Sequence, residues 1–428
     1  MCGQGGLLFH SFGSARRFGQ RIGVAGRLAF AAIVALSLAA CEEVNPSAST
    51  NNNDSFSASA PVTPVQTEPL PGAPSAPGGA AGSGPVHVAM ILPLTQASGT
   101  PSVVGTSLEN AANLAVAESG GNSVTIAFKD DHSTPDGAKA AAQQAVTEND
   151  DLILGPLFSP NVRAVGEIAQ AANKPVIAFS TDTSTAAPGV YLLSFLIENY
   201  VDRIVDYAAS QGKHSFAALI PNNDYGRVAS AEFQQIAAQR GLRVVELENY
   251  TPQTLSTAVG KIAAFGNQID ALFIPEQAEA MPAMARALTA AGLNSHKVQI
   301  LGTGLWNDAR VLGLPALQGA WFAAPDNGGF QAFAQRYRAK YGSDPTRIAT
   351  LGYDAVSLVI ALARRGGADK FSENVLTNSA GFNGADGVFR FKPNGQNERA
   401  LAIFQIENGS AVALSQAPRS FAGRSSAT

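Results

Sequence analysis

The sequence predicts an α/β protein with two lobes, each built on a parallel β-sheet. The chain has 428 residues, two to three times the length of a typical single domain. Hydrophobic residues make up 46% of it, which is enough for a large core. From residue 86 onward, short apolar runs alternate with longer helical patterns, in two successive series. This alternation is typical of βαβ units.

The first series predicts four strands and three helices. The expected strands cover residues 86–92, 124–128, 152–154 and 176–179. The expected helices cover residues 105–119, 137–148 and 161–171, where apolar residues recur at helical spacing. In such sheets ligands bind beyond the carboxyl ends of the strands, so the loops that follow the strands are the expected binding loops.

The second series begins after Tyr191 and predicts a second lobe. Its expected strands cover residues 216–220, 242–247, 271–274 and 298–301, and its expected helices cover 199–210, 225–240, 255–265 and 279–291. Two long helices are expected at 329–341 and 347–363. The last apolar runs, 387–391 and 401–406, are expected to pair as two β-strands.

The first forty residues are typical of an export signal. They contain four arginines and no acidic residue, followed by an uncharged run at 28–40. As a helix this run spans about 20 Å, too short for a hydrocarbon core of about 30 Å. We expect a signal peptide over residues 1–40. A short transmembrane anchor is the alternative.

The end of this segment, Leu38-Ala39-Ala40-Cys41, resembles the lipobox of bacterial lipoproteins. The resemblance implies cleavage before Cys41 and acylation of that residue, which would anchor the protein to the inner or the outer membrane of a Gram-negative bacterium. The cysteine count agrees, because Cys2, the other cysteine, lies in the segment that would be removed.

Residues 41–85 are rich in Pro, Ser, Ala and Gly, and we expect a disordered tether there. The tail 417–428 is expected to be disordered as well.

Basic residues number 29 and acidic residues 33, a net charge of −4, which argues against a nucleic-acid partner.

The sequence lacks the common catalytic and metal-binding motifs. It has no phosphate-binding G-x-x-x-x-G-K-[ST] loop, no G-x-S-x-G elbow and no H-E-x-x-H helix. None of its five histidines stands three or four residues from another. We therefore expect a protein that is not an enzyme and that has no metal or cofactor.

Several motifs in order resemble the type I periplasmic binding proteins, specifically the leucine/isoleucine/valine-binding class. They include Met90-Ile-Leu-Pro-Leu-Thr95, Ile153-Leu-Gly-Pro-Leu-Phe-Ser159, Asn223-Asp-Tyr-Gly226 and Gly352-Tyr-Asp-Ala355. The resemblance implies two Rossmann-like lobes, joined by three hinge crossovers near Leu196, Ala324 and Phe382. Lobe 1 would comprise residues 86–196 and 325–382, and lobe 2 residues 197–324 and 383–416.

The same resemblance implies a small polar ligand, such as an amino acid or an amide, bound between the lobes. The residues expected to contact it are Thr95, Ser98, Ser159, Ser180, Thr181, Tyr225 and Glu276. Ser159 matches a serine that hydrogen-bonds an amino-acid ligand, although it is equally compatible with a helix N-cap before Pro160. Tyr225 matches a cleft tyrosine, with a core or rim role as the alternative, and Glu276 would supply the partner of an ammonium group.

Two function classes remain open at this point. The first is a lipid-anchored substrate-binding protein that works with the permease of an amino-acid ABC transporter in the periplasm. The second follows from Leu92-Pro-Leu94 and Gly155-Pro-Leu157, which resemble the lipoprotein activators of penicillin-binding proteins. Such a protein would regulate a peptidoglycan synthase through protein contacts. Asp182 departs from the pattern of the amino-acid-binding class, because its carboxylate would repel that of the ligand unless it points away.

Overall fold

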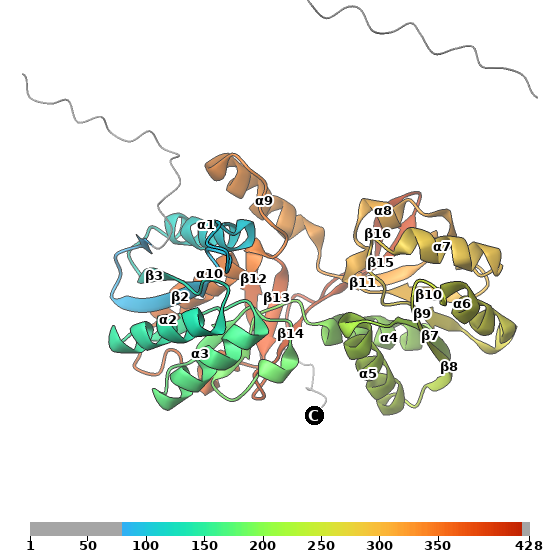
Figure 1. Ribbon diagram of the computed structural model, residues 1–428, viewed down its shortest axis with the longest axis horizontal. Coiled ribbons are helices and arrows are strands. Elements are labelled where there is room, and N and C mark those ends of the chain that lie inside the picture. The colour runs from blue at the N-terminus through green and yellow to red at the C-terminus, as the bar shows by residue number, and fades with distance from the viewer. Residues whose placement is uncertain (1–78, 422–428) are drawn as a thin grey trace, which may run out of the picture. The chain divides into compact units, whose positions relative to one another are not determined.

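The computed structural model describes residues 79–421 (Figure 1). The expected signal peptide, Cys41 and most of the expected tether lie outside the described residues. Within residues 79–421, no helix combines the length and the apolar character needed to cross a membrane.

The first lobe is a six-stranded sheet with the order β1-β3-β2-β4-β5-β6. Five of its strands are parallel: β2 (Val86–Leu92), β3 (Val124–Asp130), β4 (Leu152–Leu154), β5 (Val176–Ala178) and β6 (Val190–Leu192). The short strand β1 (Ala80–Ala81) pairs antiparallel with β3. The tether was expected to reach Pro85, and this part of the prediction is wrong, because Ala80–Ala81 pairs with the open edge of β3.

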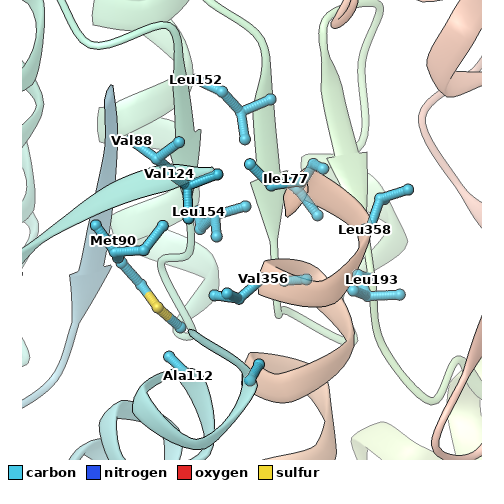
Figure 2. Close-up of a cluster of buried hydrophobic side chains, with 14 of the residues drawn as sticks. Val88, Met90, Ala112, Val124, Leu152, Leu154, Ile177, Leu193, Val356 and Leu358 are labelled. Atoms are coloured by element: carbon cyan, nitrogen blue, oxygen red, sulfur yellow. The ribbon is translucent and has the colours of Figure 1, made fainter. Parts of the chain in front are cut away.

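Helices cover both faces of this sheet. Its helices are α1 (Val103–Glu118), α2 (Pro135–Thr147), α3 (Ser159–Ala171), α9 (Asn327–Tyr341), α10 (Ala349–Arg365) and α11 (Glu373–Leu376). One face packs against α1 and α10, and the other packs against α2 and α3. Figure 2 shows the first of these layers, where Met90 of β2, Leu154 of β4 and Val356 of α10 point toward one another. All three side chains are fully buried.

The second lobe is a seven-stranded sheet with the order β16-β15-β11-β10-β9-β7-β8. Its parallel strands are β7 (Ser215–Pro221), β8 (Arg243–Tyr250), β9 (Ala271–Phe273), β10 (Gln299–Gly302) and β11 (Trp321–Ala324). Two antiparallel strands, β15 (Ala402–Glu407) and β16 (Ser410–Ser415), extend the sheet beyond β11.

The helices of the second lobe are α4 (Ile197–Ser210), α5 (Asp224–Gln239), α6 (Leu255–Ala264), α7 (Met281–Ala290) and the short α8 (Ala309–Leu312). Helices α4 and α5 pack on one face of the sheet, and α6 and α7 pack on the other. The two lobes with parallel sheets that the sequence predicts are therefore confirmed.

A third sheet corrects two predictions about the end of the chain. Strands β12 (Phe382–Gly384), β13 (Gly387–Phe391) and β14 (Asn397–Arg399) pair antiparallel with one another. The expected pairing of 387–391 with 401–406 is therefore wrong. Phe389 and Phe391 bury their rings in the core of the first lobe, so the third crossover lies between Arg399 and Ala402, later than the expected position near Phe382.

Hydrogen bonds connect the first crossover to the residues that precede the third. The carbonyl oxygen of Ser194, in the first crossover, accepts bonds from Asn397 (2.8 Å) and from Nε of Arg399 (3.0 Å), which precede the third. The expected disorder from residue 417 onward is also corrected in part. Phe421 is buried against Val388, with the Arg390 guanidinium 4.6 Å from its ring centre.

Candidate ligand-binding site

The loops at the carboxyl ends of the lobe-1 strands carry several of the expected residues. After β2, the backbone N–H and the hydroxyl of Thr95 donate to Asp130 at the end of β3 (3.1 and 2.7 Å). The same hydroxyl lies 2.9 Å from Nδ1 of His132. Partial burial alone would raise the pKa of Asp130, but these hydrogen bonds and that from the His132 N–H lower it. Thr95 therefore lies in a fixed polar cluster, whereas Ser98 is exposed and its hydroxyl lies 3.0 Å from that of Thr100.

Ser159 and Ser180 meet at the start of α3. Their hydroxyl oxygens are 3.1 Å apart, although Ser159 begins α3 and Ser180 lies in the loop after β5. The N-cap of α3 is Phe158, which makes no side-chain capping bond. The N-cap interpretation of Ser159 is therefore wrong, because Ser159 is the first residue of the helix. This arrangement places two hydroxyls beside an uncapped helix N-terminus, which favours negative charge.

The carboxylate of Asp182 lies beside this pair of serines, because the Ser159 side chain is one of its hydrogen-bond partners. Its backbone N–H donates to Ser180 (3.1 Å), and its side chain pairs with Arg163 of α3 (2.8 Å) and accepts a bond from Ser184. Burial acts to raise the pKa of Asp182, but the bonds from Ser184 and Ser159 and the charge of Arg163 together outweigh it, so the pKa is lowered. A negative charge therefore stands next to the serine pair, and Arg163, which pairs with it, neutralises it in part. The neighbouring Thr181 is exposed.

In the second lobe, Tyr225 lies in the first turn of α5. Its hydroxyl donates to Oγ1 of Thr303 (2.8 Å), a fully buried residue after β10. Burial raises the pKa of Tyr225, so the phenol stays protonated. Asn223 caps the helix by accepting from the Gly226 N–H (2.8 Å), which fixes the tyrosine at the strand end.

We expect Asn223→Ala to lower the free energy of unfolding by about 1 kcal/mol, the usual contribution of a helix N-cap. Urea denaturation would measure it. The adjacent Asn222→Ala is the matched control, since Asn222 is exposed and makes no capping bond. Equal stability of the two variants would contradict this role.

The carboxylate of Glu276 is less free to bind the ammonium group of a ligand than the sequence suggests. It is buried, and the Tyr250 hydroxyl donates to its Oε2 (2.5 Å) while the N–H of Gln277 donates to Oε1 (2.7 Å). Both carboxylate oxygens therefore already have protein donors. Tyr250 ends β8, which β7 separates from β9 in the same sheet, so this contact brings together residues 26 positions apart in sequence.

Glu198 was not identified from the sequence. The Thr183 hydroxyl of lobe 1 donates to its Oε1 (2.9 Å), which ties the loop after β5 to the start of α4 in lobe 2. Burial raises the pKa of Glu198, and its Oε2 is buried with no hydrogen-bond partner. The signal that could have found it is its place just after the expected crossover at Leu196.

Apolar side chains flank the hydroxyls on both lobes. Phe158, next to Ser159, is 43% exposed, and Leu305, two residues after Thr303, is 36% exposed. Hydroxyls and a helix N-terminus suit a carboxylate, and exposed apolar groups suit a hydrocarbon portion. Among the described residues, no group of three or more His, Cys, Asp or Glu side chains is placed to hold a metal ion.

The model of the periplasmic binding protein family matches residues 85–411 of this chain. A curated relative, an uncharacterized protein from Rickettsia prowazekii, is 27% identical over 126 residues, 29% of this chain. The match spans 34% of that protein, so the chain matches about a third of its length.

Three solved structures share the fold. A protein from Rhodospirillum rubrum, described as a branched-chain amino acid ABC transporter, has a TM-score of 0.67 and 21% identity, covering 77% of this chain and 99% of that one. A leucine-binding protein from Thermotoga maritima has a TM-score of 0.53 and 21% identity, covering 78% and 98%. A solute-binding protein of an ABC transporter from Rhodopseudomonas palustris, in complex with 3,4-dihydroxybenzoic acid, has a TM-score of 0.54 and 21% identity, covering 78% and 98%. With two α/β lobes joined by three crossovers, this chain belongs to the periplasmic binding protein family and has its type I fold.

Proposed function

We propose that the protein is a periplasmic receptor that binds a small carboxylate-bearing solute between its two lobes and delivers it to an ABC permease. The amino acids and amides expected from the sequence belong to this class, and so do aromatic acids. The proposal includes anchoring through acylated Cys41 after removal of residues 1–40, as the lipobox resemblance implies.

The observation that carries the proposal is the pair of hydroxyls of Ser159 and Ser180, 3.1 Å apart at the uncapped start of α3. Hydroxyls and free helix N–H groups are the donors that a carboxylate needs, and the helix dipole adds a favourable field. Tyr225 offers an amphipathic side chain at the corresponding strand ends of lobe 2. The solved relatives support this choice, since the Thermotoga maritima protein is a leucine-binding protein and the Rhodopseudomonas palustris protein holds an aromatic acid.

We expect titration of the full chain with a panel of amino acids, amides and aromatic acids to give saturable binding of at least one of them. In the double variant Ser159→Ala/Ser180→Ala, its affinity should fall by about tenfold or more. A hydrogen bond to a charged group contributes about 1.5–3 kcal/mol, and 1.4 kcal/mol corresponds to tenfold. Isothermal titration calorimetry would measure this.

Ser410→Ala, at the exposed start of β16, is the matched control and should bind as the unmodified protein does. Absence of binding to every member of the panel would contradict the receptor. Unchanged affinity in the double serine variant would leave the receptor standing but would remove the two serines from its site.

A further inference from the structure

A cavity lies beside the hinge, and neither Ser159 nor Ser180 lines it. Its volume is about 960 Å³, within the usual range of small-molecule sites. One wall comes from α4 and α5 of lobe 2, with Glu198, Asp202 and Glu232. The other comes from β13, β14 and the turn between them, with Lys392 and Arg399. Because the walls belong to different lobes, an occupant would contact both.

The wall from α4 and α5 holds acceptors that lack donors. Oε2 of Glu198 and Oδ1 of Asp202 are buried without a hydrogen-bond partner. The carboxyl of Asp202 lies against that of Glu232, and these two acceptors share a hydrogen bond only when one of them holds a proton. The nearby Arg240 does not serve as a donor to these acceptors, since it forms a two-point ion pair with Asp206 (2.7 and 2.9 Å).

The facing wall holds a guanidinium, that of Arg399, whose charge acts on the buried Asp354 but whose terminal nitrogens lack hydrogen-bond acceptors. Arg399 is only 4% exposed, and its Nε donates to the carbonyl of Ser194. Its guanidinium lies over the rings of Phe195 (4.7 Å) and Phe389 (5.4 Å). Its Nη1 and Nη2 have no hydrogen-bond partner. A guanidinium with two free nitrogens is suited to a carboxylate.

We propose that this hinge cavity binds a zwitterionic solute, a free amino acid or a short peptide, with its ammonium group at Glu198 and Asp202 and its carboxylate at Arg399. Such a ligand supplies donors to one wall and acceptors to the other. An anion alone would leave the carboxylates of α4 without partners, and a cation alone would leave Arg399 without one. The residues that would hold the ligand here differ from Ser159 and Ser180. The bond from Thr183 to Glu198 connects it to the loop after Ser180.

Binding at this site is linked to a proton. Burial, with the hydrogen bond and the charge of Glu232, raises the pKa of Asp202 to about 8. The other charged groups that act on Asp202 are Lys392 from the facing hairpin, Asp206 from α4 and Arg240, which follows the last residue of α5. An ammonium group beside Asp202 favours its ionised form, so binding at neutral pH releases a proton. Affinity therefore rises with pH up to about 8, by at most about tenfold per pH unit.

The test is calorimetric titration of the full chain with L-leucine, L-lysine and L-alanyl-L-alanine, in phosphate and in Tris at the same pH. The expected result is that at least one of these binds with a heat that differs between the buffers, because the released proton is taken up by the buffer. Its affinity should also rise between pH 6.5 and 7.5. Asp202→Asn and Glu232→Gln should each abolish the proton release, the second serving as a check if the first folds poorly. Asp224→Asn, a fully exposed carboxylate on α5, should leave it unchanged.

The double variant Ser159→Ala/Ser180→Ala separates the two sites, and it should retain the proton-linked binding. Loss of all binding in that variant, with Asp202→Asn and Glu232→Gln unaffected, would overturn the hinge site while supporting the site at the strand ends. Absence of any proton-linked binding by the three probes would overturn the hinge site as well. Equal affinity for putrescine, which has no carboxylate, would overturn the zwitterionic class.

Discussion

Replacing Arg347 by alanine should lower the free energy of unfolding by about 3–5 kcal/mol, the usual cost of leaving a buried charge without its partner. Asp386 is fully buried, and Arg347 donates to both of its carboxylate oxygens (2.9 and 2.6 Å). The guanidinium also lies over the rings of Phe195 (4.7 Å) and Phe330 (4.5 Å). Phe195 belongs to the first crossover, so the substitution weakens the hinge as well as the pair. Urea denaturation would measure the loss.

Arg310→Ala is the matched control. Arg310 makes a similar two-point pair with Asp308, but the Asp308 side chain is 31% exposed, whereas that of Asp386 is fully buried. Exposed ion pairs contribute about 0–1 kcal/mol, so this variant should be nearly as stable as the unmodified chain. If Arg347→Ala and Arg310→Ala lower the free energy of unfolding equally, then leaving the buried carboxylate of Asp386 without its partner does not destabilise the protein as we expect.

Asp354→Asn should stabilise the protein at neutral and alkaline pH. Asp354 is buried on α10, its Oδ1 accepts from the N–H of Ala385 (2.6 Å), and its Oδ2 has no partner. Burial raises its pKa from 3.8 to about 7, with the charge of Arg399 opposing the rise. Between these pH values the folded protein holds a proton that the unfolded chain has lost. Stability therefore falls as the pH rises from about 4 to 7, and this contribution stays constant above 7.

An asparagine keeps the bond from Ala385 and has no charge to bury. The gain at pH 8 should be on the order of 2–4 kcal/mol, from a shift of about three pKa units at 1.36 kcal/mol each, and it should vanish below pH 4. Stability curves against pH would show it. For the control Asp369→Asn, at an exposed position after α10, the curve of unfolding free energy against pH should run parallel to that of the unmodified chain. If the curve for Asp354→Asn also ran parallel to that of the unmodified chain, the buried carboxylate of Asp354 would not destabilise the folded protein.

The fold was largely predictable because its strands and helices have strong local patterns. Residues 152–154 form a strand with the expected bounds, and α1 differs from the expected helix by two residues at its start, where Ser102 caps it by accepting from Gly105. The sequence does not predict which lobe residues 387–391 join. Phe389 and Phe391 indicate an apolar strand, but they do not indicate which lobe's core the strand packs against.

The candidate site shows the same limit. Matching the motif placed Ser159 and Ser180 in neighbouring loops, and the structure brings their hydroxyls within 3.1 Å. Glu276 was expected to be available to a ligand, but Tyr250 on another strand donates to it. Glu198 was missed because its contact with Thr183 joins two lobes and has no local signature. Which polar side chains keep free hydrogen-bonding capacity depends on such long-range partners.

A crystal structure of the full chain with the solute that it binds most tightly would test the central claim most directly. The account predicts the carboxylate of that solute within hydrogen-bond distance of Ser159 and Ser180, with Tyr225 of the other lobe closing over its remainder. A solute bound only elsewhere, with the hydroxyls of Ser159 and Ser180 paired to each other as they are without it, would contradict the account.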